Sequence, residues 1–206
     1  MISKVLMTGA TQAPDWNKVI TSPGGLRRRL LHFIEREVAR SARRNRGRIL
    51  AKMNSRLHRL TPEKVYAAAL VVKLDPDSSS VKLANAGLPY PFVLRHDRGL
   101  VEEVRLSGLP LGLFNGRASG TYRTHTLDID YGDVLLLSSD GIGSVEDDKG
   151  MSFEDYGRIP RTLAELSGQP GQAIIESLVS DAVAFSKGQP LPDDINLVAI
   201  TRDAKG

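Results

Sequence analysis

Two short acidic segments at strand ends are the residues best suited to chemistry. The Asp140-Gly141 pair follows the apolar run Val134–Ser138, whose composition predicts a strand buried on both faces. The Asp193-Asp194 pair precedes a second apolar run, Ile195–Thr201. Carboxylates at the ends of two neighbouring strands would converge, and such oxygen ligands suit magnesium or manganese. The sequence therefore predicts a metal site for hydrolysing phosphate esters, built from Asp140 and from Asp193 or Asp194. Gly141 would let the backbone approach closely.

Plainer explanations of these segments stay open at this level. Asp-Gly after a strand is a common turn composition, and Asp-Asp after proline is common in caps and solvated loops. A competing motif, Asp128-Ile129-Asp130, resembles that of aspartyl-phosphate phosphatases but lacks the apolar strand that should precede it. Residues 75–79 begin like a calcium loop, yet the glycine and the closing glutamate of that loop are missing.

The composition excludes several other kinds of site. The chain has 206 residues and no cysteine, which excludes disulfides, thiolate zinc sites, iron–sulfur clusters and cysteine nucleophiles. No two histidines lie four residues apart, and His96 and His125 are expected to be exposed and inert. Ser138 and Ser139 have no nucleophile elbow around them and are expected to bond backbone groups. No apolar run approaches the roughly 20 residues of a membrane helix, so we expect a cytoplasmic protein without a membrane partner.

The hydrophobic pattern predicts an α+β domain of mainly antiparallel strands with helices packed outside. Residues 1–25 are poorly defined, and Ser3–Gln12 fits either a helix or a strand. Helices are expected over 26–44, 49–60, 152–166 and 172–185. Strands are expected over 65–74, 81–85, 92–95, 100–106, 122–129, 134–138 and 195–201. No linker separates two cores, so one domain is expected over 1–206, with a sheet core at 63–203.

Positive charge is concentrated in a basic helical segment, 26–60. Residues 26–59 hold 12 lysines and arginines and two acids, a balance of +10; since the whole chain carries +4, the remainder carries −6. The segment could bind nucleic acid or an acidic partner protein, or form a solvated helix face. The arginines lie on both sides of the apolar stripe and few aromatic residues are near. This pattern favours an acidic protein over nucleic acid.

Four motifs occur in an order that resembles a known family. They are Asn85-Ala86-Gly87-Leu88-Pro89-Tyr90-Pro91, Gly108-Leu109-Pro110-Leu111-Gly112-Leu113, the run from Gly132 to Gly141, and Asp193-Asp194-Ile195-Asn196-Leu197. Over roughly residues 50 to 202 the chain resembles the bacterial metal-dependent serine/threonine protein phosphatases of the PPM class, in the branch of SpoIIE and RsbU. The resemblance implies a two-layer antiparallel β-sandwich flanked by helices. It also implies removal of phosphate from phosphoserine or phosphothreonine with two Mn²⁺ or Mg²⁺ ions.

The resemblance assigns roles to particular residues. Asp140 and Asp193 match metal ligands of the family, and Asp194 is the neighbouring acid. Asn85 and Gly87 match positions that shape the turn after a hairpin. The implied partner is a phosphorylated protein in bacterial signalling, such as an anti-anti-sigma factor of a partner-switching system. A homodimer is one arrangement that the sequence leaves open.

The chain also departs from the family pattern. Leu88 stands where the family often has histidine, and Tyr90 where it has proline. The family's upstream Asp-x-x-Gly-His-Gly motif, whose aspartate bridges both metals, is missing, and Asp15 is the only aspartate before Asp75. Ser3–Thr8 resembles the helix that follows that motif, so we expect an N-terminally truncated, partial domain. The alternative function is a catalytically impaired pseudophosphatase or partner-binding domain of the same fold.

Overall fold

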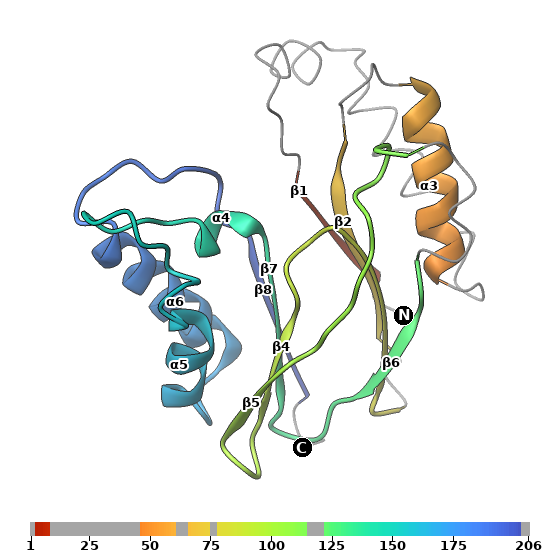
Figure 1. The fold of residues 1–206 in the computed structure, drawn as a ribbon. Helices are drawn as coiled ribbons and strands as arrows, with labels where there is room; N and C mark the ends of the chain where they lie inside the picture. The colour runs from red at the N-terminus through yellow and green to blue at the C-terminus, as the bar shows by residue number, and fades with distance from the viewer. Residues whose placement is uncertain (1–2, 9–45, 61–65, 75–77, 115–121, 203–206) are drawn as a thin grey trace. The chain divides into compact units, whose positions relative to one another are not determined.

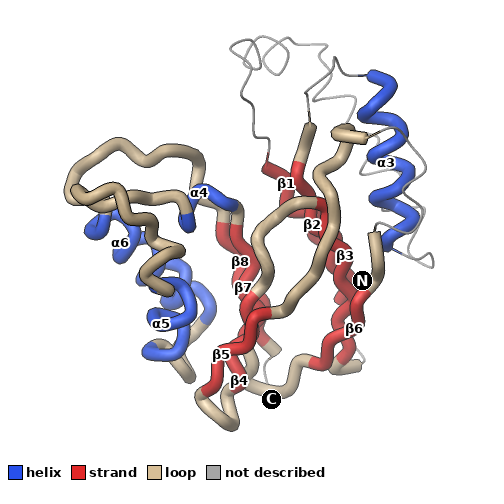
Figure 2. The backbone as a smooth tube through the Cα atoms, viewed as in Figure 1, coloured by secondary structure: helices blue, strands red, loops and turns tan. Residues whose placement is uncertain are grey.

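The backbone forms two compact units. The computed structural model describes residues 3–8, 46–60, 66–74, 78–114 and 122–202 (Figures 1 and 2). One unit lies within Met1–Leu88 and Leu106–Leu127, and the other within Pro89–Arg105 and Asp128–Gly206. The expected helix over 26–44 lies outside the described residues, as does most of 1–25. No helix in the described part of the chain has the length and apolar character needed to cross a bilayer.

The first unit contains a four-stranded sheet in the order β1-β2-β3-β6. Its strands are β1 (Ser3–Thr8), β2 (Ala68–Leu74), β3 (Ser80–Ala86) and β6 (His125–Asp128). β1 pairs antiparallel with β2, from Ser3 opposite Lys73 to Thr8 opposite Ala68. β2 and β3 form the predicted antiparallel hairpin.

The edge strand β1 corrects one expectation. Ser3–Thr8 resembles a family helix in sequence, but its six residues form a strand. A helix of this length is not stable in isolation, because nucleation costs more than so few hydrogen bonds return. Pairing with β2 satisfies the backbone groups along one side of the segment. A contact with a distant segment therefore decides its structure.

Helix α3 (Arg46–Leu60) covers one face of this sheet (Figure 1). Its buried apolar residues recur three or four positions apart, and they are Ile49, Leu50, Met53 and Leu57. They pack against small strand residues that let the helix approach closely: Ala69, Val71, Ala84 and Ala86. The helix expected over 49–60 is confirmed and begins slightly earlier.

The turn after β3 is built by Asn85 and Gly87. The Asn85 side chain donates from Nδ2 to the carbonyls of Leu88 (2.8 Å) and Leu106 (2.9 Å), and its Oδ1 accepts the Leu88 N–H. Gly87 has a φ of +86°, and a Cβ there would lie 2.7 Å from Pro110 Cγ. Both residues therefore shape the backbone.

The second unit contains a four-stranded antiparallel sheet in the order β5-β4-β7-β8. Its strands are β4 (Phe92–Arg95), β5 (Leu100–Glu103), β7 (Val134–Ser138) and β8 (Leu197–Thr201). All five residues of β7 are buried, as its continuous apolar run predicts. The central position of β7 explains this burial, because it has a neighbour on each side.

Helices α5 (Arg158–Glu165) and α6 (Gly171–Phe185) lie over one face of this sheet (Figure 1), and α4 (Asp140–Gly143) is a single turn at the end of β7. The core beneath the helices is apolar and includes Leu94, Val134, Leu136, Phe153, Leu163, Ile174 and Leu178. Arg158 joins α5 to α6 through an ion pair with Asp181. Antiparallel sheets with helices packed on them confirm the α+β class.

Helix α5 begins later than the predicted start at Ser152, because a turn precedes it. Ser152 Oγ accepts the N–H of Asp155 at 3.0 Å, and Asp155 Oδ2 accepts the N–H of Ser152 at 3.3 Å. Gly157, with a φ of +59°, then leads the chain into the helix. The reciprocal side-chain bonds between Ser152 and Asp155 hold this segment in a turn, so it does not become part of the helix.

Candidate metal centre

The two acidic segments are adjacent because β7 and β8 are neighbouring strands. Their last paired residues are Ser138 and Leu197. One step further, the Ser139 N–H donates to the Asn196 carbonyl at 2.9 Å. Backbone pairing thus continues past the ends of the strands and brings the two acidic pairs together, as expected if the two strands are neighbours.

The Ser139 side chain joins the two segments a second time. Its hydroxyl donates to the Asp194 carbonyl at 3.1 Å and accepts the Asn196 N–H at 3.0 Å. The Ser139 residue is 1% exposed, and both bonds are partly buried. Buried polar groups of this kind are costly to leave unpaired. Ser139 therefore bonds backbone groups, as the sequence predicts, and fixes one acidic segment against the other.

Gly141 lies in direct contact with the second acidic segment. A Cβ at this position would be 2.3 Å from the Asp194 carbonyl oxygen and 3.4 Å from that of Asp193. The first distance is shorter than any tolerated contact, and the obstacle is backbone, which cannot swing away. Only glycine fits here without a shift of the chain, which gives the Asp-Gly pair a steric explanation.

The three predicted ligands are exposed at this junction. The Asp140, Asp193 and Asp194 side chains all face solvent. Asp193 Oδ1 accepts the N–H of Asp194 at 2.7 Å, and the Asp140 carbonyl accepts the Ser144 hydroxyl at 2.9 Å. Within the described residues, no three histidine, aspartate or glutamate side chains form a group that could hold a metal. The structure brings the acidic segments together, and their role as ligands stays a prediction.

Glu154 is a further acid beside this loop, and its position in the sequence did not indicate a site. Its N–H donates to the Gly143 carbonyl at 3.1 Å, and a Cβ on Gly143 would lie 3.1 Å from Glu154 Oε2. The carboxylate therefore lies next to α4, the turn that begins at Asp140. No motif marks Glu154, because the turn that brings it back to α4 has no periodic pattern.

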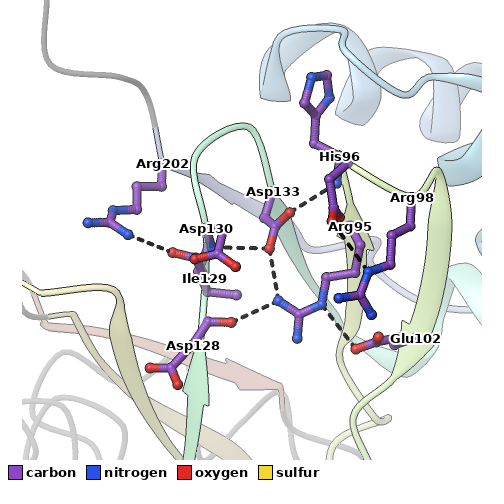
Figure 3. A network of polar contacts seen from close by, with 10 residues as sticks. Arg95, His96, Arg98, Glu102, Asp128, Ile129, Asp130, Asp133 and Arg202 are labelled. Carbon is purple, nitrogen blue, oxygen red and sulfur yellow. Dashed lines mark hydrogen bonds and ion pairs between the residues drawn. The ribbon is translucent and has the colours of Figure 1, made fainter.

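At the opposite end of β7 from Asp140, directly before the strand begins, lies the buried aspartate Asp133 (Figure 3). Its carboxylate is 2% exposed and accepts the N–H groups of His96 (2.9 Å) and Asp130 (3.1 Å) and the Arg95 guanidinium (2.8 Å). Burial favours the neutral acid, but these donors outweigh it and hold the pKa of Asp133 below its ordinary value. Asp133 is thus a charged anchor of the turn before β7.

The competing Asp-x-Asp motif belongs to the same turn. Asp128 ends β6, and its carbonyl accepts the Arg95 guanidinium at 2.8 Å (Figure 3). Asp130 is exposed and gives its N–H to Asp133. Neither acid follows a buried strand, so the motif lacks the setting that phosphoryl-transfer chemistry would need. His96 is exposed, as expected, whereas His125 in β6 is half-buried, which corrects the expected exposure of that residue.

Fold and sequence together define the class of protein. The antiparallel sheets and the helices packed on them match the fold of solved PP2C phosphatase domains. The family model described as "Stage II sporulation protein E (SpoIIE)" matches residues 26–203. The chain therefore belongs to the SpoIIE family.

Solved structures agree on the fold. The SiaA-PP2C domain of Pseudomonas aeruginosa superposes with a TM-score of 0.76 at 18% identity, over 98% of this chain and 76% of that chain. A structure of the PP2C phosphatase domain with a fragment of the regulatory domain of SpoIIE from Bacillus subtilis gives 0.76 at 20% identity, over 98% and 53%. RsbX in complex with magnesium gives 0.58 at 14% identity, over 96% and 85%. At such identities the likeness shows the fold alone.

One curated relative matches a short segment. A polyphosphate kinase from Exiguobacterium sibiricum is 33% identical over 63 residues, which are 31% of this chain and 9% of that protein. The chain thus spans about a tenth of that relative, and it spans about half of the SpoIIE structure.

Proposed function

We propose that this chain is a Mn²⁺- or Mg²⁺-dependent phosphoserine/phosphothreonine protein phosphatase of bacterial signalling. The observation that carries the proposal is the junction of two acidic segments, held by Ser139 and by the contact at Gly141. Membership of the SpoIIE family supports it. Water would attack phosphorus directly as the bond from phosphorus to the serine or threonine oxygen breaks, and a proton would pass to that oxygen, releasing the free hydroxyl and inorganic phosphate. The chain has no cysteine, so a phosphocysteine intermediate is excluded.

The donor set at the junction suits a hard divalent cation. Asp140, Asp193 and Asp194 offer carboxylate oxygens from two backbone segments whose contact is fixed. When bound, the cation would supply Lewis acidity and offset charge on the phosphoryl oxygens. A SpoIIE phosphatase domain described as "Mn presoaked" and RsbX in complex with magnesium support this choice of metal. This chain's part is to hold the acids in place and keep them accessible.

The proposed substrate is a phosphorylated signalling protein. An anti-anti-sigma factor in the cytoplasm is the type that the family resemblance implies. We also propose a homodimer as an arrangement of this domain.

A second function has an observation in its favour. Within the described residues no three acids or histidines form a group that could hold a metal, and β1, an edge strand, carries no aspartate or glutamate. Two ions facing so few carboxylates would be incompletely neutralised. The alternative is therefore a catalytically impaired domain of the same fold that binds a partner protein.

Manganese-dependent hydrolysis of a phosphoserine peptide and of p-nitrophenyl phosphate separates the two functions. We expect turnover in the wild type and a loss of about 100-fold in Asp140→Asn, because a ligand is removed. Asp97→Asn is the matched control, since Asp97 is an exposed acid of the same unit that pairs with Arg98.

Calorimetric titration with Mn²⁺ completes the test. Turnover that is absent from the wild type, together with Mn²⁺ binding that Asp140→Asn abolishes, would support the impaired domain. Equal turnover in wild type and Asp140→Asn would refute the assigned site.

A further inference from the structure

Strand β8 is an edge of the second sheet (Figure 1). It has β7 on one side, and none of the described strands pairs with it on the other. Every residue of the central strand β7 is buried, whereas every residue of β8 is partly or fully exposed. An edge strand presents a row of backbone groups to which a further strand can pair.

The backbone groups of β8 alternate between two directions. The carbonyls of Asn196 and Arg202 accept the N–H groups of Ser139 and Gly132, each at 2.9 Å, and so face the β7 side. Because this direction alternates along a strand, the even-numbered residues between them also bond toward β7. The odd-numbered residues direct their N–H and C=O groups away from β7, and they are Leu197, Ala199 and Thr201. No bond from the described residues reaches these outward groups.

The side chains of β8 do not protect the edge. The strand reads Leu-Val-Ala-Ile-Thr, without a charge, a proline or a glycine. The opposite edge of the same sheet, β5, ends in Glu102 and Glu103. Charged residues on an edge strand deter pairing with another chain. One edge of this sheet is therefore protected by its composition and the other is not.

The two faces of β8 have different surroundings. A Cβ on Gly171, the first residue of α6, would lie 3.2 Å from Ala199 Cβ and 3.3 Å from Thr201 Cγ2, so these side chains point toward α6. Val198 and Ile200 lie on the opposite face, because successive side chains of a strand alternate. Both are β-branched and half-buried, a type that packs well across a pair of strands.

We propose that β8 pairs antiparallel with β8 of a second copy of this chain, with Ala199 at the centre of the pair. Leu197 then lies opposite Thr201 of the partner subunit, and each outward N–H meets an outward carbonyl. On the other face, Val198 lies opposite Ile200 of the partner subunit. This pairing rests on the homodimer proposed above and gives it a surface, and it does not require the acidic junction to be catalytic.

The charges at the two ends of β8 favour a second copy in this orientation. Asp193 and Asp194 precede the strand, and Arg202 follows it. Arg202 is held at this end by a bond to the Ile129 carbonyl at 3.1 Å. In an antiparallel self-pair the acidic start of each strand lies near the basic end of the other, whereas a parallel self-pair would bring acids against acids. Pairing through one edge per copy also closes with two copies.

Sedimentation equilibrium of the full chain tests the pairing without metal or substrate, so a failure of the phosphatase proposal would leave this result unaffected. A single pair of strands makes a small interface, and we expect a dissociation constant on the order of 100 µM. Ala199→Pro should weaken the dimer about tenfold, because proline removes an outward N–H and no bond to β7. Thr201→Lys is the milder variant and should weaken the dimer about threefold, because lysine deters edge pairing.

Glu103→Pro is the matched control at the other edge of the same sheet. The Val104 N–H donates to the Pro91 carbonyl at 2.7 Å, so by the same alternation the Glu103 N–H faces away from β4. This variant should leave the dimer unchanged within about twofold. Circular dichroism melts establish that every variant is folded.

Amide hydrogen exchange of the wild type gives a second readout that needs no variant. The amides of Ala199 and Thr201 should exchange about tenfold more slowly at high protein concentration than at low concentration, because pairing protects them. The amides of Val198 and Ile200 bond toward β7 and should exchange slowly at both concentrations.

The proposal would be overturned by a chain that stays monomeric at every concentration. A dimer that persists in Ala199→Pro, or that Glu103→Pro weakens as much, would place the interface elsewhere. Protection of the Ala199 and Thr201 amides that is equal at every concentration would show that another part of this chain covers the edge of β8.

Discussion

Strand β7 has a glycine-aspartate pair before it and an aspartate-glycine pair after it, and the two ends use their carboxylates in opposite ways. Asp133 is buried and accepts bonds from two backbone N–H groups and from Arg95. Asp140 is exposed, and its segment is positioned by the neutral Ser139 and by close backbone contact at Gly141. The same two residue types thus serve anchoring at one end and accessibility at the other.

This difference shows what makes an acid available for binding. A buried carboxylate must have its oxygens satisfied by donors, and those donors then compete with any cation. The oxygens of an exposed carboxylate on a fixed backbone are hydrated, and a cation can bind them by displacing water. Changes at the anchoring end should affect stability alone, and changes at the accessible end should also affect metal binding.

The largest expected effect on stability is at the anchoring end. Asp133→Asn should lower the free energy of unfolding by about 3 kcal/mol, because an amide cannot match three donors and Arg95 loses the buried one of its two carboxylate partners, Asp133 and Glu102. Urea unfolding measures the loss. Mn²⁺ affinity by calorimetry should stay unchanged in the folded variant, and a parallel loss of Mn²⁺ binding would show that the two ends are not separate.

The acid dependence of stability checks the cause of that loss. The pKa of Asp133 is lowered in the folded state, so its contribution is present above the ordinary aspartate pKa of 3.8 and disappears as pH falls through the folded value. The wild type should therefore lose stability in this acid range, and Asp133→Asn should lose less. Equal slopes for both proteins would contradict the anchoring role.

At the other end, Gly141→Ala should affect both properties. The added Cβ would overlap the Asp194 carbonyl, so the acidic segments must separate. We expect a loss of about 2 kcal/mol in urea unfolding and Mn²⁺ binding about tenfold weaker. Gly143→Ala is the matched control on the same turn, because its Cβ would meet the mobile end of Glu154 at 3.1 Å. If Gly143→Ala lost as much stability and Mn²⁺ affinity as Gly141→Ala, the steric explanation would be wrong.

The smallest expected effect is at Ser139. Ser139→Ala should cost about 1 kcal/mol by leaving the Asp194 carbonyl and the Asn196 N–H without their partner. Mn²⁺ affinity should fall about threefold as the two segments loosen. Ser144→Ala, at an exposed serine that bonds the Asp140 carbonyl, should stay within about 0.5 kcal/mol of the wild type. If Ser139→Ala changed stability but left Mn²⁺ affinity intact, Ser139 would be structural only.

Local pattern predicted much of the fold. β7 has the bounds that its apolar run predicts, and the helix expected over 172–185 begins one residue earlier as α6. β1 and the start of α5 were not predictable in this way. The first depends on pairing with β2, and the second on side-chain bonds between Ser152 and Asp155.

The candidate site, like the fold, was predictable from the sequence only where local pattern determines it. The types and spacing of Asp140, Gly141, Asp193 and Asp194 were visible in the chain, together with the strands beside them. The burial of Asp133 and the position of Glu154 were not, since both depend on partners brought by other elements.

The sequence by itself determined which segments are apolar strands, which faces of the helices are buried, and that acids stand at two strand ends. These properties follow from the order of side chains along one segment, because periodicity encodes a face. Only the tertiary structure decided that β7 and β8 are neighbours, that the Ser139 hydroxyl bonds the Asp194 carbonyl, and that Arg48, Lys52, Arg56 and Arg59 of α3 are exposed. The choice of a strand's partner depends on contacts between distant segments, which no local pattern contains.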